Sequence, residues 1–255
     1  MSIDTISSVS PSDTAICTAD PADQALPPLS DVPPPLPDYL HRTYYWAYLS
    51  PLGRSLLDRS LVVSSILWGN ANRLMDSAAQ EFAPGQRVLQ TACVYGDFSA
   101  RLARQVGPTG RLIVADVAPI QIEYCRRKLT TYPQATAHLA DAAGALPGKD
   151  HNGICCFFLL HEVPEDYKTR IVNNLLEQLP IGGKIVFVDY HRPRSWHPMK
   201  GIMWLVFRTL EPYASSLWDK EINSYAHHRE QFRWNKQTFF GGLYQKVVAE
   251  RISLS

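Results

Sequence analysis

Hydrophobic and polar positions change their pattern several times along the 255-residue chain. Residues 1–37 are rich in Ser, Asp and Pro, and their apolar side chains are too few to offset the entropy of ordering. We therefore predict a disordered tail there. From residue 38 aromatic and aliphatic side chains crowd together, and residues 38–83 predict an N-terminal helical cap or lid. Such a cap either only covers a sheet or also closes over an apolar substrate, and the sequence leaves both interpretations open.

Beyond residue 84, short apolar runs alternate with helical patterns. The predicted strands are 87–90, 111–116, 135–139, 154–160 and 184–189, and the predicted helices are 98–106, 119–129 and 164–179. The run 154–160 is continuously apolar, as in a central strand that is buried on both faces. This alternation of strand and helix predicts an α/β fold with a doubly wound, mostly parallel sheet.

The C-terminal third has a different pattern. Residues 195–218 predict a long, aromatic-rich helix, and residues 232–250 predict an antiparallel hairpin with Gly241 and Gly242 at a turn or bulge. Two hairpin strands would bring the sheet to seven, so residues 84–255 are expected to form one domain. Basic residues flank the tryptophans of the predicted helix, which is typical both of a helix on a membrane surface and of a core helix with basic edges.

Charge and cysteine content narrow the function classes. A formal net charge of +1 gives no reason to expect a nucleic-acid partner. The five cysteines lack metal-site spacing, so we expect reduced thiols and a cytoplasmic protein. Neither a membrane-spanning apolar run nor a signal-peptide pattern is evident in the sequence.

The first strand-to-helix turn is the place where nucleotide-binding sheets bring a ligand close to backbone amides. Glycines favour that approach, but here Ala92 and Val94 replace two glycines of the usual pattern and only Gly96 remains. Gln90 occupies the position at which an acidic residue is common, and Tyr95 adds bulk to the turn. Alone, this segment is weak evidence for a cofactor site.

The spacing of later residues strengthens the evidence for a cofactor site. Asp116 ends the second predicted strand twenty residues after Gly96, where a carboxylate accepts hydrogen bonds from both ribose hydroxyls, and Val117 follows it. Asp141 and Ala142 follow the third strand, where an acceptor can meet an adenine amino group, although Asp141 also suits a helix N-cap. Together these positions predict a class I methyltransferase fold, Rossmann-like, that binds S-adenosylmethionine.

Polar side chains also follow the fourth and fifth strands. Leu159 and His161 stand after the fourth, and Asp189 and His191 after the fifth. Ligands of open α/β sheets lie beyond these carboxyl ends, so His161, Asp189 and His191 are candidate ligands for a divalent ion such as Mn²⁺. Alternatively, His161 stacks on the cofactor and Asp189 caps a turn. Glu162 is expected to face away or to stabilise the following helix.

Several segments resemble the RquA family of rhodoquinone biosynthesis proteins. These segments are residues 44–49, 66–70, 93–99, 158–164 and 239–244, within a resemblance that spans about 38–250. The resemblance implies that S-adenosylmethionine donates its amino group, with support from Mn²⁺, to replace a methoxy group of ubiquinone. It also implies Tyr95, His161 and His191 as catalytic candidates.

A physical interpretation fits that chemistry. An attacking amine must be neutral, and the amide of Gln90 would not hold it as ammonium in the way a carboxylate does. Because ubiquinone carries a long lipid tail, we expect peripheral contact with the inner membrane. Two other readings stay open: a methyltransferase that acts on a quinone or another lipid, and a non-catalytic partner protein that binds S-adenosylmethionine.

Overall fold

The computed structural model describes residues 67–94, 96–209 and 211–253. The disordered tail predicted for residues 1–37, and the helical cap up to residue 66, lie outside the described residues. The last part of the predicted cap is described and forms helix α4 (Ala71–Ala79), which buries Leu74, Met75 and Ala78 against the sheet. The predicted role of the cap as a lid therefore stays a prediction.

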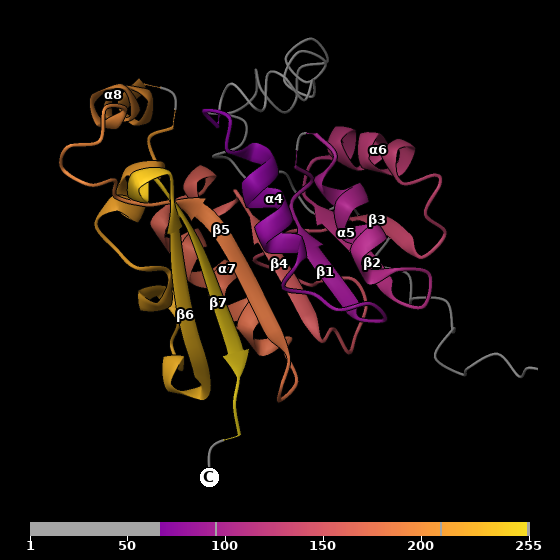
Figure 1. Cartoon of the computed structure of the whole chain (residues 1–255). Coiled ribbons are helices and arrows are strands. Elements are labelled where there is room, and N and C mark those ends of the chain that lie inside the picture. Colours follow the sequence, from indigo (N-terminus) through magenta and orange to yellow (C-terminus); the bar gives the residue numbers. More distant parts are fainter. Residues whose placement is uncertain (1–66, 95, 210, 254–255) are drawn as a thin grey trace, which may run out of the picture.

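A seven-stranded sheet forms the centre of the molecule, in the order β3-β2-β1-β4-β5-β7-β6 (Figure 1). Five strands run parallel, and β7 pairs antiparallel with both β5 and β6. The strands are β1 (Arg87–Thr91), β2 (Arg111–Asp116), β3 (Ala135–Leu139), β4 (Gly153–Phe157), β5 (Lys184–Tyr190), β6 (Phe232–Phe239) and β7 (Tyr244–Arg251). The predicted doubly wound, mostly parallel sheet of seven strands is confirmed.

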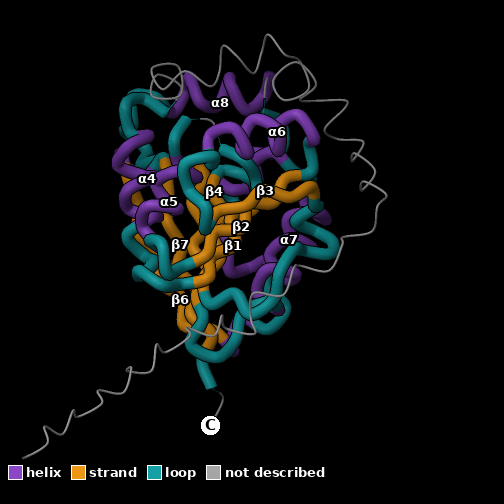
Figure 2. Tube along the Cα trace, turned by 90° about the vertical axis from the view of Figure 1, so that its right-hand side faces the viewer, coloured by secondary structure: helices purple, strands orange, loops and turns teal. Residues whose placement is uncertain are grey.

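Helices cover both faces of this sheet, so that it lies between two apolar layers (Figure 2). The α-helices besides α4 are α5 (Phe98–Val106), α6 (Pro119–Lys128), α7 (Glu165–Glu177) and α8 (Lys200–Thr209). Helices α4, α5 and α6 pack on one face, and α7 packs on the other. Every residue of β4 is buried, as expected of a central strand covered on both sides.

Short 3-10 helices connect the remaining elements. They are η3 (Leu160–Glu162), η4 (Ala214–Trp218), η5 (Ile222–Tyr225), η6 (Arg229–Gln231) and η7 (Phe240–Gly242). The turn η7 joins β6 to β7, and Gly241 and Gly242 adopt φ values of 60° and 93° there. These left-handed values suit glycine, so the predicted hairpin with its glycine turn is confirmed.

The long helix predicted for residues 195–218 is wrong in extent. Helix α8 covers only Lys200–Thr209, and the chain resumes helical turns at η4. Pro212 explains the break, because proline lacks the N–H that a continuing helix needs. Glu211 lies at this break, directly before Pro212. None of the described helices is long and apolar enough to cross a membrane.

Candidate functional site

The turn after β1 is held in an unusual backbone conformation. Ala92 has φ +75°, a left-handed value that costs a residue with a Cβ about 1 kcal/mol or more. Its N–H donates to Ala115 O on β2 at 2.7 Å, which keeps the turn against the neighbouring strand. Ala92 thus adopts the conformation of the glycine it replaces.

Gln90 lies buried immediately before this turn. Its side chain is 0% exposed, and its Nε2 donates to Ala92 O at 2.9 Å. Its Oε1 is buried and has no hydrogen-bond partner among the described residues. A buried acceptor without a partner is costly, so this amide oxygen is prepared to accept from a ligand donor.

Asp116 stands at the end of β2, beside the turn. One carboxylate oxygen accepts from the Cys93 N–H at 2.6 Å, and the other accepts from the Ala118 N–H at 2.8 Å. Burial raises the pKa of this carboxyl to about 6, although the backbone N–H groups oppose the shift. These backbone contacts fix the carboxylate at the end of β2, the position at which an acid can accept hydrogen bonds from a ribose diol.

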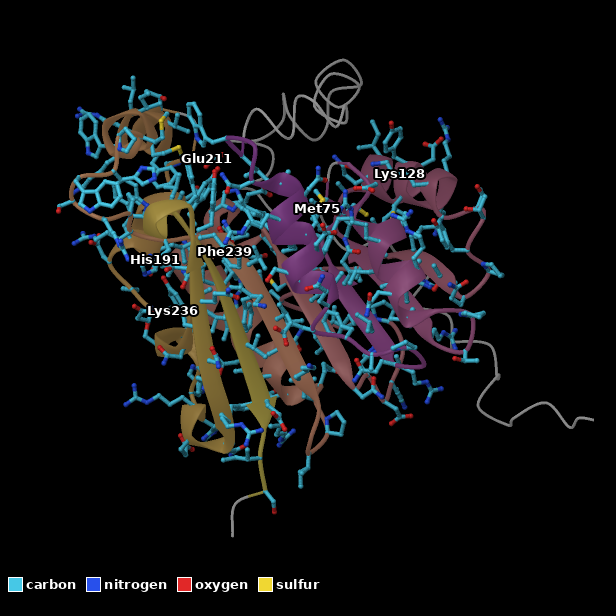
Figure 3. The ribbon with its side chains drawn as sticks, in the orientation of Figure 1. Met75, Lys128, His191, Glu211, Lys236 and Phe239 are labelled. Atoms are coloured by element: carbon cyan, nitrogen blue, oxygen red, sulfur yellow. The ribbon has the colours of Figure 1, made fainter. Side chains whose placement is uncertain are left out.

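Two other elements border the turn. Gly96 has φ +85°, and its carbonyl accepts from Lys128 Nζ on α6 at 2.7 Å. Figure 3 shows Lys128 on α6 and Met75 on α4, on the two helices that flank α5. The predicted residue Tyr95 lies outside the described residues, so its role in the site stays a prediction.

The segments after β2 and β3 lie next to each other, because Asp116 and Leu139 are paired in the sheet. Val117 is half-buried directly after Asp116. Asp141 accepts from the Ala143 N–H at 2.8 Å with one carboxylate oxygen. This contact closes a short turn, and no described helix begins there, so the alternative that Asp141 is a helix N-cap is wrong. Ala142 packs against the apolar layer below.

A strained residue ends β4. Phe158 has φ +51°, and its N–H donates to Val188 O at 2.7 Å. The strand is shorter than the predicted run to residue 160 for this reason. Leu159 follows half-buried, and η3 then places His161 under the carboxyl ends of β4 and β5.

His161 and Asp189 form a buried hydrogen-bonded pair. His161 Nδ1 lies 2.9 Å from Asp189 Oδ1, and Asp189 Oδ2 accepts from the backbone N–H groups of Leu160 and His161. Burial lowers the pKa of His161, but the charges of Asp189 and Glu211 outweigh it and raise the pKa to about 9. The imidazolium form is thus favoured at neutral pH, and its Nε2 lies 3.7 Å from Glu162 Oε1. Glu162 therefore faces His161, although the sequence favoured a side chain that faces away or stabilises the following helix.

The predicted metal ligands do not form a metal-binding group. His161 and Asp189 come together, but His191 Nδ1 lies 2.8 Å from Gly242 O and its Nε2 faces Lys236. Both Asp189 oxygens already accept hydrogen bonds, and no group of three or more His, Cys, Asp or Glu in the described parts of the chain is placed to hold a metal ion. His191 is therefore not brought to the pair of His161 and Asp189 in this structure, and the metal role of the three residues stays a prediction.

Glu211 is a site residue that the sequence reasoning missed. It follows α8, and Figure 3 shows it between α8 and the upper end of β5. Its Oε2 is buried without a hydrogen-bond partner, and burial raises the pKa of its carboxyl. A lone acid before Pro212 within an aromatic segment was the only available signal.

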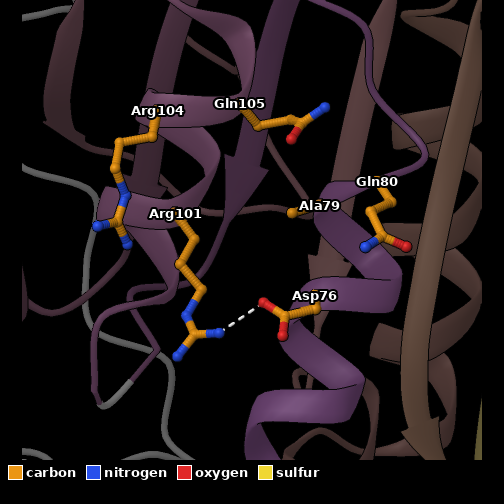
Figure 4. A pocket seen from close by; sticks show the side chains of 6 residues that line it. All are labelled: Asp76, Ala79, Gln80, Arg101, Arg104 and Gln105. Carbon is orange, nitrogen blue, oxygen red and sulfur yellow. Dashed lines mark hydrogen bonds and ion pairs between the residues drawn. The ribbon is translucent and has the colours of Figure 1, made fainter.

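A separate surface hollow of about 280 Å³ lies between α4 and α5 (Figure 4). It is lined by Asp76, Ala79, Gln80, Arg101, Arg104 and Gln105. Arg101 is engaged there in an ion pair with Asp76 at 2.5 Å. No strand terminus contributes to this hollow, so it is distinct from the turn that holds Gln90 and Asp116.

Comparisons with known proteins agree with this geometry. Residues 88–183 match a methyltransferase domain family. The ubiquinone/menaquinone biosynthesis C-methyltransferase UbiE of Shewanella halifaxensis is 29% identical over 160 residues, which cover 59% of this chain and 60% of that protein. UbiE of Teredinibacter turnerae is 26% identical and is aligned over 71% of this chain and 75% of its own length.

Solved structures share the fold at low sequence identity. An O-methyltransferase family protein from Burkholderia thailandensis aligns with a TM-score of 0.63 and 11% identity, covering 82% of this chain and 62% of that one. The N-methyltransferase NodS from Bradyrhizobium japonicum, in complex with S-adenosyl-L-homocysteine, gives 0.54 and 13%, covering 81% and 95%. The finer resemblance to the RquA family stays a prediction. The chain therefore has the class I S-adenosylmethionine-dependent methyltransferase fold, and part of it is similar to C-methyltransferases of ubiquinone and menaquinone biosynthesis.

Proposed function

We propose that this chain binds S-adenosylmethionine across the carboxyl edge of the sheet and transfers a group from it to a ubiquinone-type ring. The observation that carries the proposal is the pairing of Asp116 with the turn after β1. There the Cys93 N–H of the turn donates to the Asp116 carboxylate, and Gln90, which immediately precedes the turn, has a buried Oε1 without a partner among the described residues. These are the two contacts that an adenosyl amino acid needs, one for its ribose and one for its amino group.

The transferred group, in this proposal, is the amino nitrogen, as the RquA resemblance implies. When bound, S-adenosylmethionine supplies either that nitrogen or its methyl group. Gln90 accepts a hydrogen bond from the amine without adding a negative charge, so the amine loses its proton more readily than it would beside a carboxylate. The overall exchange would form a ring carbon–nitrogen bond, and it would break both the ring carbon–oxygen bond to the methoxy group and the bond between the amino nitrogen and the α-carbon of the donor. Methanol would leave with a proton from the amine, and water would supply the hydroxyl group that ends on the donor carbon.

The pair of His161 and Asp189 is proposed to act on the ring. Asp189 fixes the orientation of the imidazole through Nδ1, and in this proposal Nε2–H turns from Glu162 Oε1, which lies 3.7 Å away, to donate to a ring oxygen. Such a donor draws electron density from the ring, which favours attack by an amine. We derive no step through Mn²⁺, because the donor atoms of the described residues do not fit a metal site.

Methyl transfer is the second candidate, and the similarity to C-methyltransferases of quinone biosynthesis favours it. Fold, cofactor and ring would then be the same. In that reaction His161 would serve the same ring oxygens, while Gln90 would only position the amino acid end of the cofactor.

A lipid-tailed ring also requires access from a membrane, and we propose peripheral contact with the inner membrane from the cytoplasmic side. Trp196, Ile202, Trp204 and Leu205 expose between 47% and 69% of their surface in and before α8. Arg208 lies over the Trp204 ring at 5.3 Å, so cationic and aromatic groups share this surface. Flotation with liposomes that contain quinone should recover the protein, and its absence from the floating fraction would contradict this contact.

Isotope labelling tests the proposal and separates its two forms. Purified protein is incubated with a ubiquinone and with S-adenosylmethionine labelled either at the amino nitrogen or at the methyl carbon. Amination places the nitrogen label in the quinone, and methyl transfer places the carbon label there. If neither label enters the quinone, with or without added Mn²⁺, the chain does not catalyse either reaction alone and the proposal fails in favour of a non-catalytic role.

A further inference from the structure

Five buried side-chain atoms have no hydrogen-bond partner in the described part of the chain. Ring contacts and electrostatic interactions connect three of them to His161. These three are Glu211 Oε2, the Tyr244 hydroxyl and Trp218 Nε1. Native proteins leave few such atoms, because each costs about 1–3 kcal/mol. Their accumulation in one place indicates a site that is completed by a ligand.

Ring contacts connect the three side chains to His161. The Phe207 ring lies 5.1 Å from Trp218 and 5.0 Å from Tyr190. The Tyr190 ring in turn lies 5.7 Å from Tyr244 and 4.9 Å from His161. The unpartnered atoms are therefore set among aromatic rings that connect to His161, and aromatic side chains with a few polar atoms are typical of sites that bind flat rings.

Glu211 lies close enough to these rings and to His161 to affect their pKa values. Besides burial, its negative charge raises the pKa of Tyr190 and of Tyr244, and it raises that of His161 as well. Glu211 lies after α8 and not within it, because the helix ends at Thr209 and Pro212 prevents its continuation.

The chemistry of these atoms defines what they bind. The indole N–H of Trp218 only donates, and the Tyr244 hydroxyl donates or accepts. The carboxylate of Glu211 only accepts, so a ligand without a donor would leave it buried and unpaired. A fully oxidised quinone ring carries only acceptor oxygens, whereas a ring hydroxyl or amine carries a donor.

We propose that Glu211, Tyr244 and Trp218 form the ring-binding site and select a benzenoid ring that carries a hydroxyl or amino donor next to acceptor oxygens. This inference rests on the proposed function and deepens it. The donor meets Glu211, and the ring oxygens meet Tyr244 and Trp218. A hydroquinone and an aminoquinone both have this chemistry, and the experiment separates them.

Equilibrium dialysis under anaerobic conditions tests the site with three short-chain rings: a dimethoxybenzoquinone, its hydroquinone and its 2-amino derivative. Wild-type protein should bind at least one donor-bearing ring more tightly than the quinone. Glu211→Gln should weaken that ring by about tenfold, because it replaces a pure acceptor by a group that also donates, and should not weaken the quinone. Tyr244→Phe should weaken all three rings by a few-fold.

Glu230→Gln is the matched control, since the Glu230 side chain is 61% exposed, and it should bind like the wild type. Tighter binding of the amino ring supports the site as one that holds the product of amination, and tighter binding of the hydroquinone supports the site together with methyl transfer. Equal affinity for all rings, or an equal loss for all in Glu211→Gln with unchanged thermal unfolding, overturns the inference. S-adenosylmethionine affinity is measured on the same preparations, so failure of the proposed function is recognised separately.

Discussion

Gln90→Glu is the substitution that tests most sharply why an amide stands at the end of β1. In the wild type Nε2 donates to Ala92 O at 2.9 Å, and Oε1 has no partner. A carboxylate cannot donate, so the variant leaves Ala92 O unpaired and buries a charge. We expect the unliganded protein to lose about 2–3 kcal/mol of unfolding free energy.

When S-adenosylmethionine is bound, the carboxylate of Gln90→Glu also affects the pKa of the donor amine. An opposite charge a few ångströms away raises the pKa of an amine by about one to two units. Each unit reduces the neutral, attacking form about tenfold at neutral pH. We therefore expect amination to fall by about 10- to 100-fold in Gln90→Glu, while affinity for S-adenosylmethionine stays within a few-fold of the wild type.

Single-turnover transfer of the nitrogen label measures the amination rate, and calorimetric titration measures the cofactor affinity of the same samples. Gln90→Met is the control, because it removes the hydrogen bonds without adding a charge. It should weaken cofactor binding yet preserve the amination rate once the site is saturated. An unchanged amination rate in Gln90→Glu would refute the reasoning, as would an equal loss in both variants.

Three further predictions concern stability and pH. Ala92→Gly should raise the unfolding free energy by about 0.5 kcal/mol in urea titrations, since relief of the φ +75° strain slightly exceeds the added entropy of the unfolded chain. Lys168→Met should lower it by about 3 kcal/mol in the same assay, because the buried Lys168 ammonium donates at 2.8 Å to two backbone carbonyls that would lose their partner. The pKa of His161, about 9 when folded, exceeds its unfolded value, so its stabilisation is complete below about pH 6.5 and is lost as the pH rises through 9. Urea titrations across this range should show a loss of up to roughly 3 kcal/mol that Asp189→Asn abolishes, whereas the titration of Asp116, with a pKa of about 6, falls below this window.

The periodicity of the sequence predicts most of the sheet because buried parallel strands are continuous apolar runs. The strands 111–116 and 135–139 and the helix 98–106 have the bounds that the pattern predicts. The predicted end of β4 is wrong, since Phe158 adopts a left-handed conformation that hydrophobicity does not encode.

For the candidate site too, the sequence predicts some residues and misses others. Asp116 and Gln90 were predictable because chain order places them at adjacent strand ends. The direction of a side chain after a strand is not encoded by spacing, and this is why His161 meets Asp189 whereas His191 turns to the hairpin. Glu211 reaches the site through the packing of α8 and η4, which connects residues distant in the sequence and leaves no local signal.

The central claim is that Asp116 holds the ribose of an adenosyl ligand, and calorimetric titration with S-adenosylmethionine tests it most directly. Two hydrogen bonds to a charged acceptor are each worth about 1.5 kcal/mol or more, so Asp116→Asn should weaken binding by about 100-fold. The exposed Asp97→Asn control, close in sequence to the same turn, should bind within about twofold of the wild type. Wild-type protein that fails to bind this ligand, or Asp116→Asn with undiminished affinity, would contradict the account.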